Sequence, residues 1–533
     1  MTLEPRVAVT TAEESRALDA RTIATLPDSY TLMHRAASIA ADWLDQQLWR
    51  SAAVYVGTGN NGGDGWVIAG LLRDRGWMIT VHASGEPKSS DARRARREAE
   101  RGGRFASPTG SEVVLVDAVL GTGAVGAPRD GALDALDAIR AQRSASSVVV
   151  AIDIPSALDA DTGEDDGALA ADVTLTFGSM KRGLLLRREI AGAIHVLDIG
   201  LVAADVTAPM LVSADAVRAW IPEMRSDAYK GTRGRLAIVG GASGMAGAVI
   251  LAARGAEASG VGMVRADVAA ASQLAVQVAV PSATVQTWHA DWSGVDTDWP
   301  HAMVIGPGLD GSREELRAQV LALLGTFTGP VVLDAGALTA FRAGRAADGE
   351  DIEDAGGGPL AHLEALRHAL RGREVLLTPH IGEFNTLINR VTTARSHVAP
   401  SLAARFDAPT ALAAFLGATV LLKGVPTVIT APDGRRLVSA AGNQALAMGG
   451  TGDLLSGIAG ALLAQGVPAF HAGAAAAWVH GTAAERAVQH HGSWRGVTMA
   501  LLLRQVSNVW PLLVAHTSSP VHTVAALPAV PCR

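Results

Sequence analysis

The chain has 533 residues, which is enough for two to four domains of roughly 150 residues each. Hydrophobic residues make up 49% and charged residues 18%, so large buried cores are expected, and a net charge of −7 argues against a dedicated nucleic-acid binder. The single cysteine, Cys532, excludes an intramolecular disulfide, and the N-terminus is acidic without the apolar run of a signal peptide. Both features predict a cytoplasmic protein.

The first half alternates helical patterns with short apolar strands. Helices are expected within residues 12–50 and at 66–72, and strands at 52–57, 79–83, 113–116, 148–152, 173–177 and 194–197. Near-continuous apolar strands separated by helices indicate a parallel sheet covered on both faces. Ligands of such sheets bind at the carboxyl ends of the strands. Polar loops occupy those ends here, at residues 60–64, 117–127 and 153–156.

Proline, charge and loss of periodicity mark a boundary near residues 203–225, and a second α/β series follows. It begins with a strand at 236–240 and a helix from Ala246. The sequence therefore predicts two α/β domains, at residues 1–212 and 213–517, with residues 518–533 as a frayed tail. The acidic, glycine-rich stretch 344–359 is expected to be an exposed loop of the second domain.

One stretch of the second half is long enough to cross a bilayer. Residues 454–480 contain no Asp, Glu, Lys or Arg and are mostly apolar. Gln465-Gly466-Val467-Pro468 interrupts this stretch, however, with residues that end helices. Two buried core helices are therefore expected, and no membrane span.

The loop Asn60–Gly65 offers amide oxygens, a carboxylate and bare backbone beside a helix start, but it lacks the Gly-x-Gly-x-x-Gly fingerprint. Asp117 and Ser156 add oxygen atoms at two further strand ends. Oxygen ligands with few charges, and no His or Cys, suit a hard cation of low charge better than zinc. Alternatively, these residues only cap helices and close turns. Convergence of three loops on one sheet edge favours a site.

Three motifs of the first half, taken in chain order, resemble those of a known family. Asn60–Gly65, Val116–Gly123 and Ala151–Ser156 resemble the NAD(P)H-hydrate epimerase domain. The resemblance implies a Rossmann-like α/β/α sandwich, a potassium ion on Asn61, Asp117 and Ser156, and interconversion of the R and S forms of a hydrated nicotinamide. It makes Asp153 the candidate acid or base. The substrate contacts that it implies are Asn60, Asn61, Gly62, Gly63, Asp64, Gly121, Thr122, Gly123, Ala124, Val125, Gly126, Ala127 and Asp153.

The epimerase resemblance has one departure. Ala157 follows Ser156 at a position where that family usually has glycine. If this position requires a positive φ, the alanine adds strain of roughly 1 kcal/mol. A backbone strained at this point would bear on the loop that carries Asp153 and Ser156.

In the second half, glycines run directly into an apolar helix at Gly449-Gly450-Thr451-Gly452-Asp453. A helix that begins there points free N–H groups and a partial positive charge at its ligand, which makes an anion site. A carboxylate beside a phosphate site suits a base that takes a proton from an attacking hydroxyl. Asp453 could equally be a first-turn residue that favours the helix dipole. The residues alone leave both possibilities open.

The second half also carries a family resemblance. Tyr229–Gly231, Thr378–Glu383, Lys423-Gly424 and Gly449–Asp453 look like the ribokinase-like fold, and more closely its NAD(P)H-hydrate dehydratase branch. This implies that a nucleotide, ADP with Mg²⁺ in bacterial members, phosphorylates the hydrate and that phosphate then leaves. Asp453 would be the catalytic base. The implied hydrate contacts are Ala248, Gly308, His380 and Asp453, and the implied nucleotide contacts are Lys423, Gly424, Val425, Pro426, Thr427 and Gly452.

Two departures are visible in the second half. Tyr229 stands where that family often has histidine, and Gln444 follows Asn443 where proline is common. For His380, a capping role at the strand end is the alternative to substrate contact. Neither departure touches the proposed base.

The fused order, epimerase first and dehydratase second, resembles the family of bifunctional NAD(P)H-hydrate repair enzymes. The resemblance implies NADHX, NADPHX and ADP as ligands, with AMP and phosphate as products, and a homo-oligomer is expected. Two alternatives stay open on the residues. One is a small-molecule kinase, for a vitamin or a sugar, with an accessory nucleotide-binding domain. The other is a metabolite-binding module without turnover.

Overall fold

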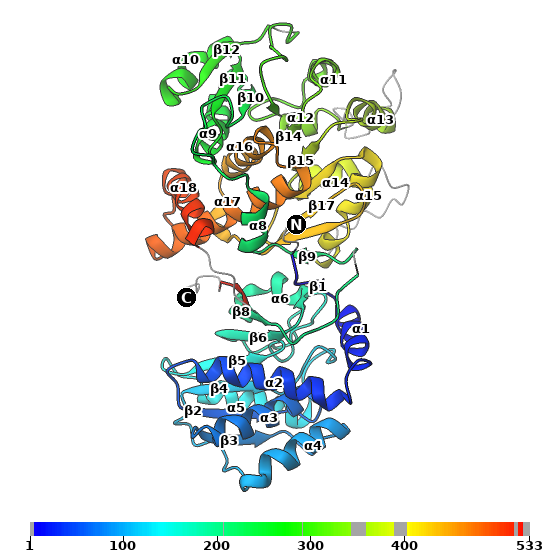
Figure 1. Ribbon diagram of the computed structural model, residues 1–533, viewed down its shortest axis with the longest axis vertical. Coiled ribbons are helices and arrows are strands. Elements are labelled where there is room, and N and C mark those ends of the chain that lie inside the picture. Colours follow the sequence, from blue (N-terminus) through cyan, green and yellow to red (C-terminus); the bar gives the residue numbers. More distant parts are fainter. Residues whose placement is uncertain are drawn as a thin grey trace, which may run out of the picture. The chain divides into compact units, whose positions relative to one another are not determined.

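The computed structural model describes residues 5–205, 207–289, 291–342, 359–388, 402–515 and 521–525. They form two compact units (Figure 1). The C-terminal unit runs from Pro209 to Thr517, and the N-terminal unit combines Arg6–Ala208 with the segment that starts at Ser518. Each unit is an α/β/α sandwich around a sheet of mainly parallel strands, which confirms the predicted fold class.

The N-terminal unit contains a seven-stranded sheet in the order β19-β8-β6-β5-β4-β2-β3. All neighbours are parallel except β19, which is antiparallel to β8. The strand order reverses between β2 and β4, which is where sheets of this type bind ligands. The strands are β2 Ser51–Val56, β3 Met78–Ala83, β4 Val114–Ala118, β5 Val148–Ile152, β6 Val173–Phe177, β8 Ala193–Leu197 and β19 Val521–Val524. A separate parallel pair joins β1 (Val9–Thr10) to β7 (Met180–Lys181).

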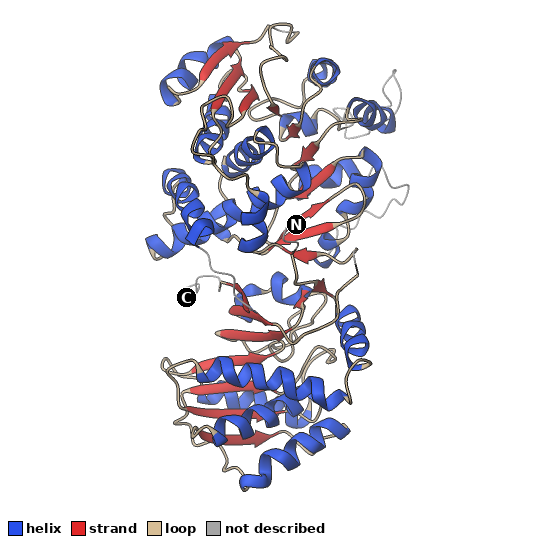
Figure 2. Cartoon of the chain, viewed as in Figure 1, coloured by secondary structure: helices blue, strands red, loops and turns tan. Residues whose placement is uncertain are grey.

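Helices cover both faces of this sheet (Figure 2). Helices α2, α3 and α4 pack on one face through residues such as Leu44 and Ile68, and α5 packs on the other through Leu136 and Ile139. The alternation of side chains along a strand feeds both cores, since Val54 faces the first and Tyr55 the second. The helices are α1 Ala12–Ile23, α2 Ser29–Asp45, α3 Asn60–Asp74, α4 Ser90–Ala99, α5 Asp130–Gln142, α6 Arg182–Leu186 and α7 Arg188–Ala191.

Helix α3 begins at Asn60, six residues earlier than the helix predicted from residue 66. The glycines that suggested a loop lie inside its first turns. A Cβ on Gly62 would come 1.9 Å from the carbonyl oxygen of Gly57, and a Cβ on Gly65 would come 2.7 Å from the Cβ of Ala118. Glycine is therefore required for close packing on the strand ends, and this packing outweighs its low helix propensity.

The C-terminal segment was predicted as a frayed tail, yet it contains strand β19. Val521 to Val524 pair with Leu197 to Ile194 of β8, and the guanidinium of Arg188 donates a hydrogen bond to the carbonyl of Ala525. Arg188 is only 2% exposed, so this end of the chain is held at a buried cation. The segment thus completes the sheet of the N-terminal unit.

The C-terminal unit contains a ten-stranded sheet in the order β12-β11-β10-β13-β14-β15-β16-β17-β18-β9. All pairs are parallel except those of β17, which is antiparallel to both neighbours. The order reverses between β10 and β13. The strands are β9 Met210–Leu211, β10 Arg235–Gly240, β11 Met263–Val268, β12 Thr284–Thr287, β13 Ala302–Ile305, β14 Val331–Leu333, β15 Val375–Leu377, β16 Thr419–Leu422, β17 Thr427–Thr430 and β18 Arg436–Ser439.

Two groups of helices enclose this sheet. One face carries α8 Ala214–Trp220, α9 Ala246–Ala258, α10 Ala270–Ala279, α16 Thr451–Ala464, α17 Ala469–His491 and α18 Met499–Ala515. The other carries α11 Glu314–Thr326, α12 Gly336–Thr339, α13 Pro359–Ala369, α14 Ile381–Ile388 and α15 Pro409–Leu416. Of the loop predicted at 344–359, all but Pro359 lies outside the described residues.

The charge-free stretch 454–480 divides as predicted into the end of α16 and the start of α17, both buried in the core. Within the described part of the chain, no helix combines the length and apolarity needed to cross a membrane.

Candidate active sites

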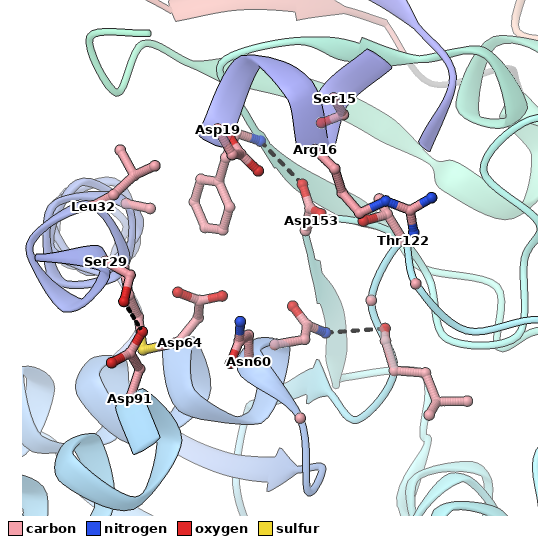
Figure 3. A pocket seen from close by; sticks show the side chains of 18 of the residues that line it. Ser15, Arg16, Asp19, Ser29, Leu32, Asn60, Asp64, Asp91, Thr122 and Asp153 are labelled. Carbon is pink, nitrogen blue, oxygen red and sulfur yellow. Dashed lines mark hydrogen bonds between the residues drawn. The ribbon is translucent and has the colours of Figure 1, made fainter. Parts of the chain in front are cut away.

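The N-terminal unit has a cavity of about 560 Å³ at the carboxyl ends of β2, β4, β5 and β6 (Figure 3). It therefore lies at the point where the strand order reverses. Of the substrate contacts expected from the sequence, those that line the cavity are Asn60, Asn61, Asp64, Gly121, Thr122, Gly123, Ala124 and Asp153. Gly62, Gly63, Val125, Gly126 and Ala127 are not part of its lining.

Asp153 follows β5 and has a φ of 66°, a left-handed conformation that aspartate tolerates better than most residues. Its Oδ1 accepts from the Lys181 ammonium at 2.5 Å, the Thr176 hydroxyl at 3.3 Å and the Phe177 amide at 3.3 Å. Three donors on one oxygen suit an ionised carboxylate. Asp153 is thus an anchored anion at the cavity wall.

Lys181 was missed in the sequence because it lies in β7, a strand of two residues with no pattern of its own, four positions after β6. It is 2% exposed and also donates to the Thr176 hydroxyl at 3.0 Å and the Phe177 carbonyl at 3.2 Å. A buried ammonium is costly without anionic and carbonyl partners. Lys181 and Asp153 therefore form a mutually dependent pair.

Two more carboxyl groups, from Asp19 of α1 and Asp64 of α3, line the same cavity. Burial raises the pKa of Asp64 well above its usual range, and the negative charges of Asp153 and Asp19 raise it further. Burial also raises the pKa of Asp19 to about 6, although the Lys181 ammonium opposes this effect. Nothing in the sequence marked Asp19 as a site residue, since it lies on a helix among other acidic residues.

The three residues proposed for the cation are brought together. Ser156 donates its amide to Asp117 at 2.9 Å and its hydroxyl at 2.6 Å, and Asn61 donates to the carbonyl of Leu120 at 3.0 Å. The buried Oδ1 of Asn61 finds no hydrogen-bond donor among the described residues. Burial raises the pKa of Asp117, partly offset by the Ser156 hydrogen bonds. An orphaned amide oxygen beside a buried carboxylate and a hydroxyl suits a cation such as potassium.

Ala157 has a φ of 69° and is buried, so the position that the sequence singled out does have a left-handed conformation. For alanine this conformation costs roughly 1–2 kcal/mol. The turn nevertheless holds Ser156 and Asp117 within hydrogen-bonding distance. The strain has therefore not disrupted the local geometry.

In the C-terminal unit, α16 begins at the carboxyl ends of β14 and β16. Its N-cap, Gly450, has a φ of 92°, a conformation that favours glycine. Asp453 lies in the first turn, as predicted. Burial and the nearby Asp334 carboxylate raise the pKa of Asp453 to about 6, while the Lys423 ammonium opposes the shift.

Lys423 lies directly beside this helix start. Its ammonium binds Asp334 Oδ1 at 2.8 Å, and a Cβ on Gly452 would come 3.3 Å from it. The other Asp334 oxygen accepts a hydrogen bond from the Ser456 hydroxyl. Asp334 was not among the site residues predicted from the sequence. It fixes a positive charge next to the free N–H groups of α16, which strengthens the anion site.

The hydrate contacts implied by the resemblance lie at neighbouring strand ends. Gly308, with a φ of 67°, approaches so closely that a Cβ there would lie 3.1 Å from the Cβ of Ala248. The His380 Nδ1 accepts from the amides of Gly382 at 3.0 Å and Glu383 at 3.2 Å, so this side chain does cap α14. Its ring is also exposed, and Nε2 lies 3.6 Å from a carboxylate oxygen of Glu383. The capping role and the substrate role are compatible.

At the predicted nucleotide contacts, the Thr427 hydroxyl donates to the carbonyl of Gly424 at 2.5 Å, and the Arg405 side chain lies against Gly424. Across the described ranges, no group of three or more His, Cys, Asp or Glu residues could hold a metal ion.

Comparison with known proteins places the chain among two-domain enzymes of nucleotide metabolism. Residues 236–508 match the NAD(P)H-hydrate dehydratase family, and residues 29–183 match the family described as YjeF-related protein N-terminus. The bifunctional NAD(P)H-hydrate repair enzyme Nnr of Escherichia coli (strain K12) is 33% identical over 86% of this chain and 85% of its own length. The corresponding enzyme of Leishmania infantum is 32% identical over 92% and 90%. The chain belongs to the family of bifunctional NAD(P)H-hydrate repair enzymes.

Solved structures resemble the C-terminal unit. An ADP/ATP-dependent NAD(P)H-hydrate dehydratase from Bacillus subtilis, co-crystallized with ATP/Mg²⁺, is 29% identical and covers 56% of this chain and 97% of its own, with a TM-score of 0.46. A ribokinase-like superfamily protein from Enterococcus faecalis is 20% identical over 57% and 95%, with a TM-score of 0.44.

Proposed function

We propose that this chain repairs hydrated nicotinamide nucleotides in two reactions. The N-terminal unit interconverts R- and S-NAD(P)HX, and the C-terminal unit dehydrates S-NAD(P)HX to NAD(P)H with ADP, releasing AMP and phosphate. The observation that carries the proposal is that one chain matches both families, each over a unit with a half-buried carboxylate at the strand ends. A small-molecule kinase needs the same base but has no use for the first unit.

For dehydration, we assign the base to Asp453. It takes the proton of the hydrate hydroxyl, whose oxygen attacks the terminal phosphoryl group of ADP while AMP leaves. The N–H groups at the start of α16 and the Lys423 ammonium stabilise the negative charge of the transferred group. Phosphate is a better leaving group than hydroxide, so its departure, with loss of a proton from the neighbouring ring carbon to water, restores the double bond of the nicotinamide ring.

The nucleotide contacts are proposed as Lys423, Gly424, Val425, Pro426, Thr427 and Gly452, and the hydrate contacts as Ala248, Gly308, His380 and Asp453. Lys423 belongs to both the nucleotide contacts and the anion site, because its ammonium lies beside Gly452. Mg²⁺ would accompany the nucleotide phosphates, since it keeps several waters in such sites and needs few protein ligands. Assembly into a homo-oligomer also stays a prediction.

For the N-terminal unit, potassium would be held by Asn61, Asp117 and Ser156. The support is the unpaired, buried Oδ1 of Asn61 beside two oxygen-bearing side chains that are themselves fixed by hydrogen bonds. When bound, the ion supplies a fixed positive charge beside the cavity. Epimerisation should respond to potassium and ignore zinc chelators, and Asp117→Ala should lose this response. Unchanged epimerisation by Asp117→Ala at fixed potassium would contradict the assignment.

The test of the whole proposal is incubation of the protein with mixed R and S hydrates and ADP. The protein should consume both forms and release phosphate and AMP in equal amounts. Formation of NAD(P)H is measured by its absorbance. A stable phosphorylated product would instead indicate a kinase. Replacing ADP by ATP in the same assay measures which nucleotide the site accepts.

A further inference from the structure

Two carboxyl groups face each other across the N-terminal cavity. Asp153 lies after β5 and Asp64 lies on the second turn of α3, and Figure 3 shows them on different walls with open space between them. The two elements flank the reversal of strand order, so their separation is fixed by the sheet and not by a flexible loop. A flat ring bound between them would present one face to each carboxyl group.

The two groups differ in their surroundings. Asp153 is bonded to the Lys181 ammonium and two further donors, which suits the ionised form. Asp64 forms no hydrogen bond or ion pair with any residue that the structure describes, and it lies near two other carboxyl groups. Burial and those charges raise the pKa of Asp64, which favours its protonated form. One group can accept a proton while the other can donate one.

We infer that Asp64 and Asp153 act as an acid and a base on opposite faces of the hydrated ring, and that this pair inverts the hydroxyl-bearing carbon. The inference rests on the proposed epimerase function. It assigns a chemical role to Asp64, which the family resemblance implies only as a substrate contact. Enzymes that use two carboxyl groups in this way place them in different environments, and here Asp153 is bonded to an ammonium whereas Asp64 forms no ion pair with any described residue.

The chemistry balances with these two groups alone. Water adds to an enamine double bond so that the hydroxyl sits on the carbon next to nitrogen, because nitrogen stabilises a cation there. Asp64 donates its proton to that hydroxyl, the C–O bond breaks, water leaves, and the nitrogen lone pair forms a C=N⁺ bond. A water on the Asp153 side then adds its oxygen to the carbon and gives its proton to Asp153. The carbon is inverted, and the two carboxyl groups have exchanged roles for the reverse reaction.

Other charged side chains line the cavity around Asp64. Asp19 and Arg16 approach from α1, Asp91 from α4, and Lys181 from β7. Asp91 is held by the Ser29 hydroxyl at 2.6 Å, whereas Asp19 has a direct electrostatic effect on Asp64. We assign Asp19 as a positioning residue that keeps Asp64 protonated. An acid must hold its proton, so activity should fall as pH rises through the pKa of Asp64.

The decisive variant is Asp64→Asn in the full chain. Asparagine has the size and neutrality of the protonated aspartic acid, so the fold should be retained, as judged by an unchanged melting temperature. Loss of epimerisation by at least about 10²-fold in both directions is expected, the low end of what a general acid supplies. Dehydration of the S form should be unaffected. Asp137→Asn, an exposed aspartate paired with Arg140 on α5, is the matched control and should behave as the unmodified chain.

Two further readouts separate this scheme from rivals. In H₂¹⁸O, the unmodified chain should place one solvent oxygen in the hydrate for each inversion, because the C–O bond breaks. Inversion without incorporation would overturn the scheme. Asp19→Asn should shift the alkaline fall of the epimerase rate to lower pH, since it removes a charge that raises the pKa of Asp64.

The possible failures are distinguishable. If the unmodified chain does not interconvert the two hydrates, the proposed function fails. If it does, and Asp64→Asn retains the rate while Asp19→Asn loses it, then Asp19 is the acid and the inference is wrong.

Discussion

The carboxyl group of Asp453 lies between opposing influences. Burial and the Asp334 carboxylate favour its protonated form, while the Lys423 ammonium favours the anion. The balance leaves a pKa of about 6, close enough to neutrality for a base that is mostly ionised at pH 7 yet still takes up a proton effectively. The same Asp334 fixes Lys423 beside the anion site, so base and charge stabilisation depend on one buried carboxylate.

Asp453→Asn should lower nucleotide-dependent dehydration by at least about 10²-fold while leaving epimerisation intact. In the unmodified chain, dehydration should fall as pH drops through about 6, because the raised pKa of Asp453 makes the base protonated below that value. The measurement is the rate of NAD(P)H formation from the S hydrate between pH 5 and 8. A flat profile, or a smaller loss in the variant, would contradict the assignment.

A substitution at Ala157 can measure the free-energy cost of backbone strain beside the proposed cation site. Its φ of 69° disfavours alanine, so glycine should relieve roughly 1–2 kcal/mol and offset the loss of a buried methyl group and of chain entropy. Ala157→Gly is therefore expected to leave the melting temperature of the N-terminal unit almost unchanged.

The control is Ala135→Gly, at a buried right-handed position of α5 in the same core. It should cost about 1–2 kcal/mol, a drop of roughly 2–8 °C for a unit of this size. Equal losses in the two variants would mean that Ala157 is not strained in solution.

Sequence reasoning identified the residues whose neighbours are unusual, and missed those whose roles depend on the fold. Asp453 and Asn61 stand in glycine-rich motifs next to apolar strands, so local pattern sufficed to single them out. Lys181 and Asp19 are brought to Asp153 by the parallel pairing of β1 with β7 and by the return of α1 to the sheet edge. Lys181 is 28 positions from Asp153, and the β1–β7 pairing joins Thr10 to Lys181 much farther along the chain, so a single sequence carries no local sign of these contacts.

At the scale of elements, β19 makes the N-terminal unit depend on the end of the chain. The strand pairs with β8, which would otherwise expose an unpaired edge, and Ala525 accepts a hydrogen bond from the buried Arg188. A buried hydrogen bond to a charged group contributes about 1.5–3 kcal/mol. Sequence periodicity could not assign a partner to this short strand, because its pairing is with residues more than three hundred positions away.

Removal of residues 518–533 should lower the melting temperature of the N-terminal unit and reduce epimerisation on heating, while dehydration persists. The physical reason is the loss of the β19 ladder together with the Arg188 contact. The measurement is calorimetric unfolding of both chains with activity assays at rising temperature. Removal of residues 526–533 alone, which leaves β19 and Ala525 in place, is the control and should have little effect. An unchanged transition after the longer deletion would show that β19 does not stabilise the unit.

Other elements were predicted well where one signal dominated. The interruption at residues 465–468 separated α16 from α17, and the strands predicted in the first half and at 236–240 appear within a few residues of their predicted bounds. The start of α3 was wrong, since the glycines of its first turns serve packing against Gly57 and Ala118. Glycine permits both a loop and a close helix contact, and only the tertiary structure decides between them.

At the scale of the molecule, the chain contains two candidate sites in two units with separate cores, each at the carboxyl ends of parallel strands. The stereochemistry of the proposed reactions explains why both would be useful in one chain. A fixed base and a fixed phosphoryl group reach a hydroxyl on one face of the ring only, so the dehydratase accepts one form and leaves the other. The epimerase converts the remaining form into substrate. The link between them is a free small molecule, which requires no contact between the two sites.

This reasoning predicts complementation between two inactive full-length variants. Given mixed hydrates and ADP, Asp153→Asn should consume the S form and then slow to the spontaneous conversion of the R form, because its epimerase lacks the base. Asp453→Asn should interconvert the hydrates without producing NAD(P)H. A mixture of the two variants should restore complete consumption, with a rate that depends on the concentration of each, since the S hydrate passes through solution. Chiral separation of the residual hydrates measures each outcome. If Asp153→Asn alone consumes both forms at equal rates, the N-terminal unit is not needed as an epimerase, and the roles proposed for Asp64, Asp153 and Lys181 fail together.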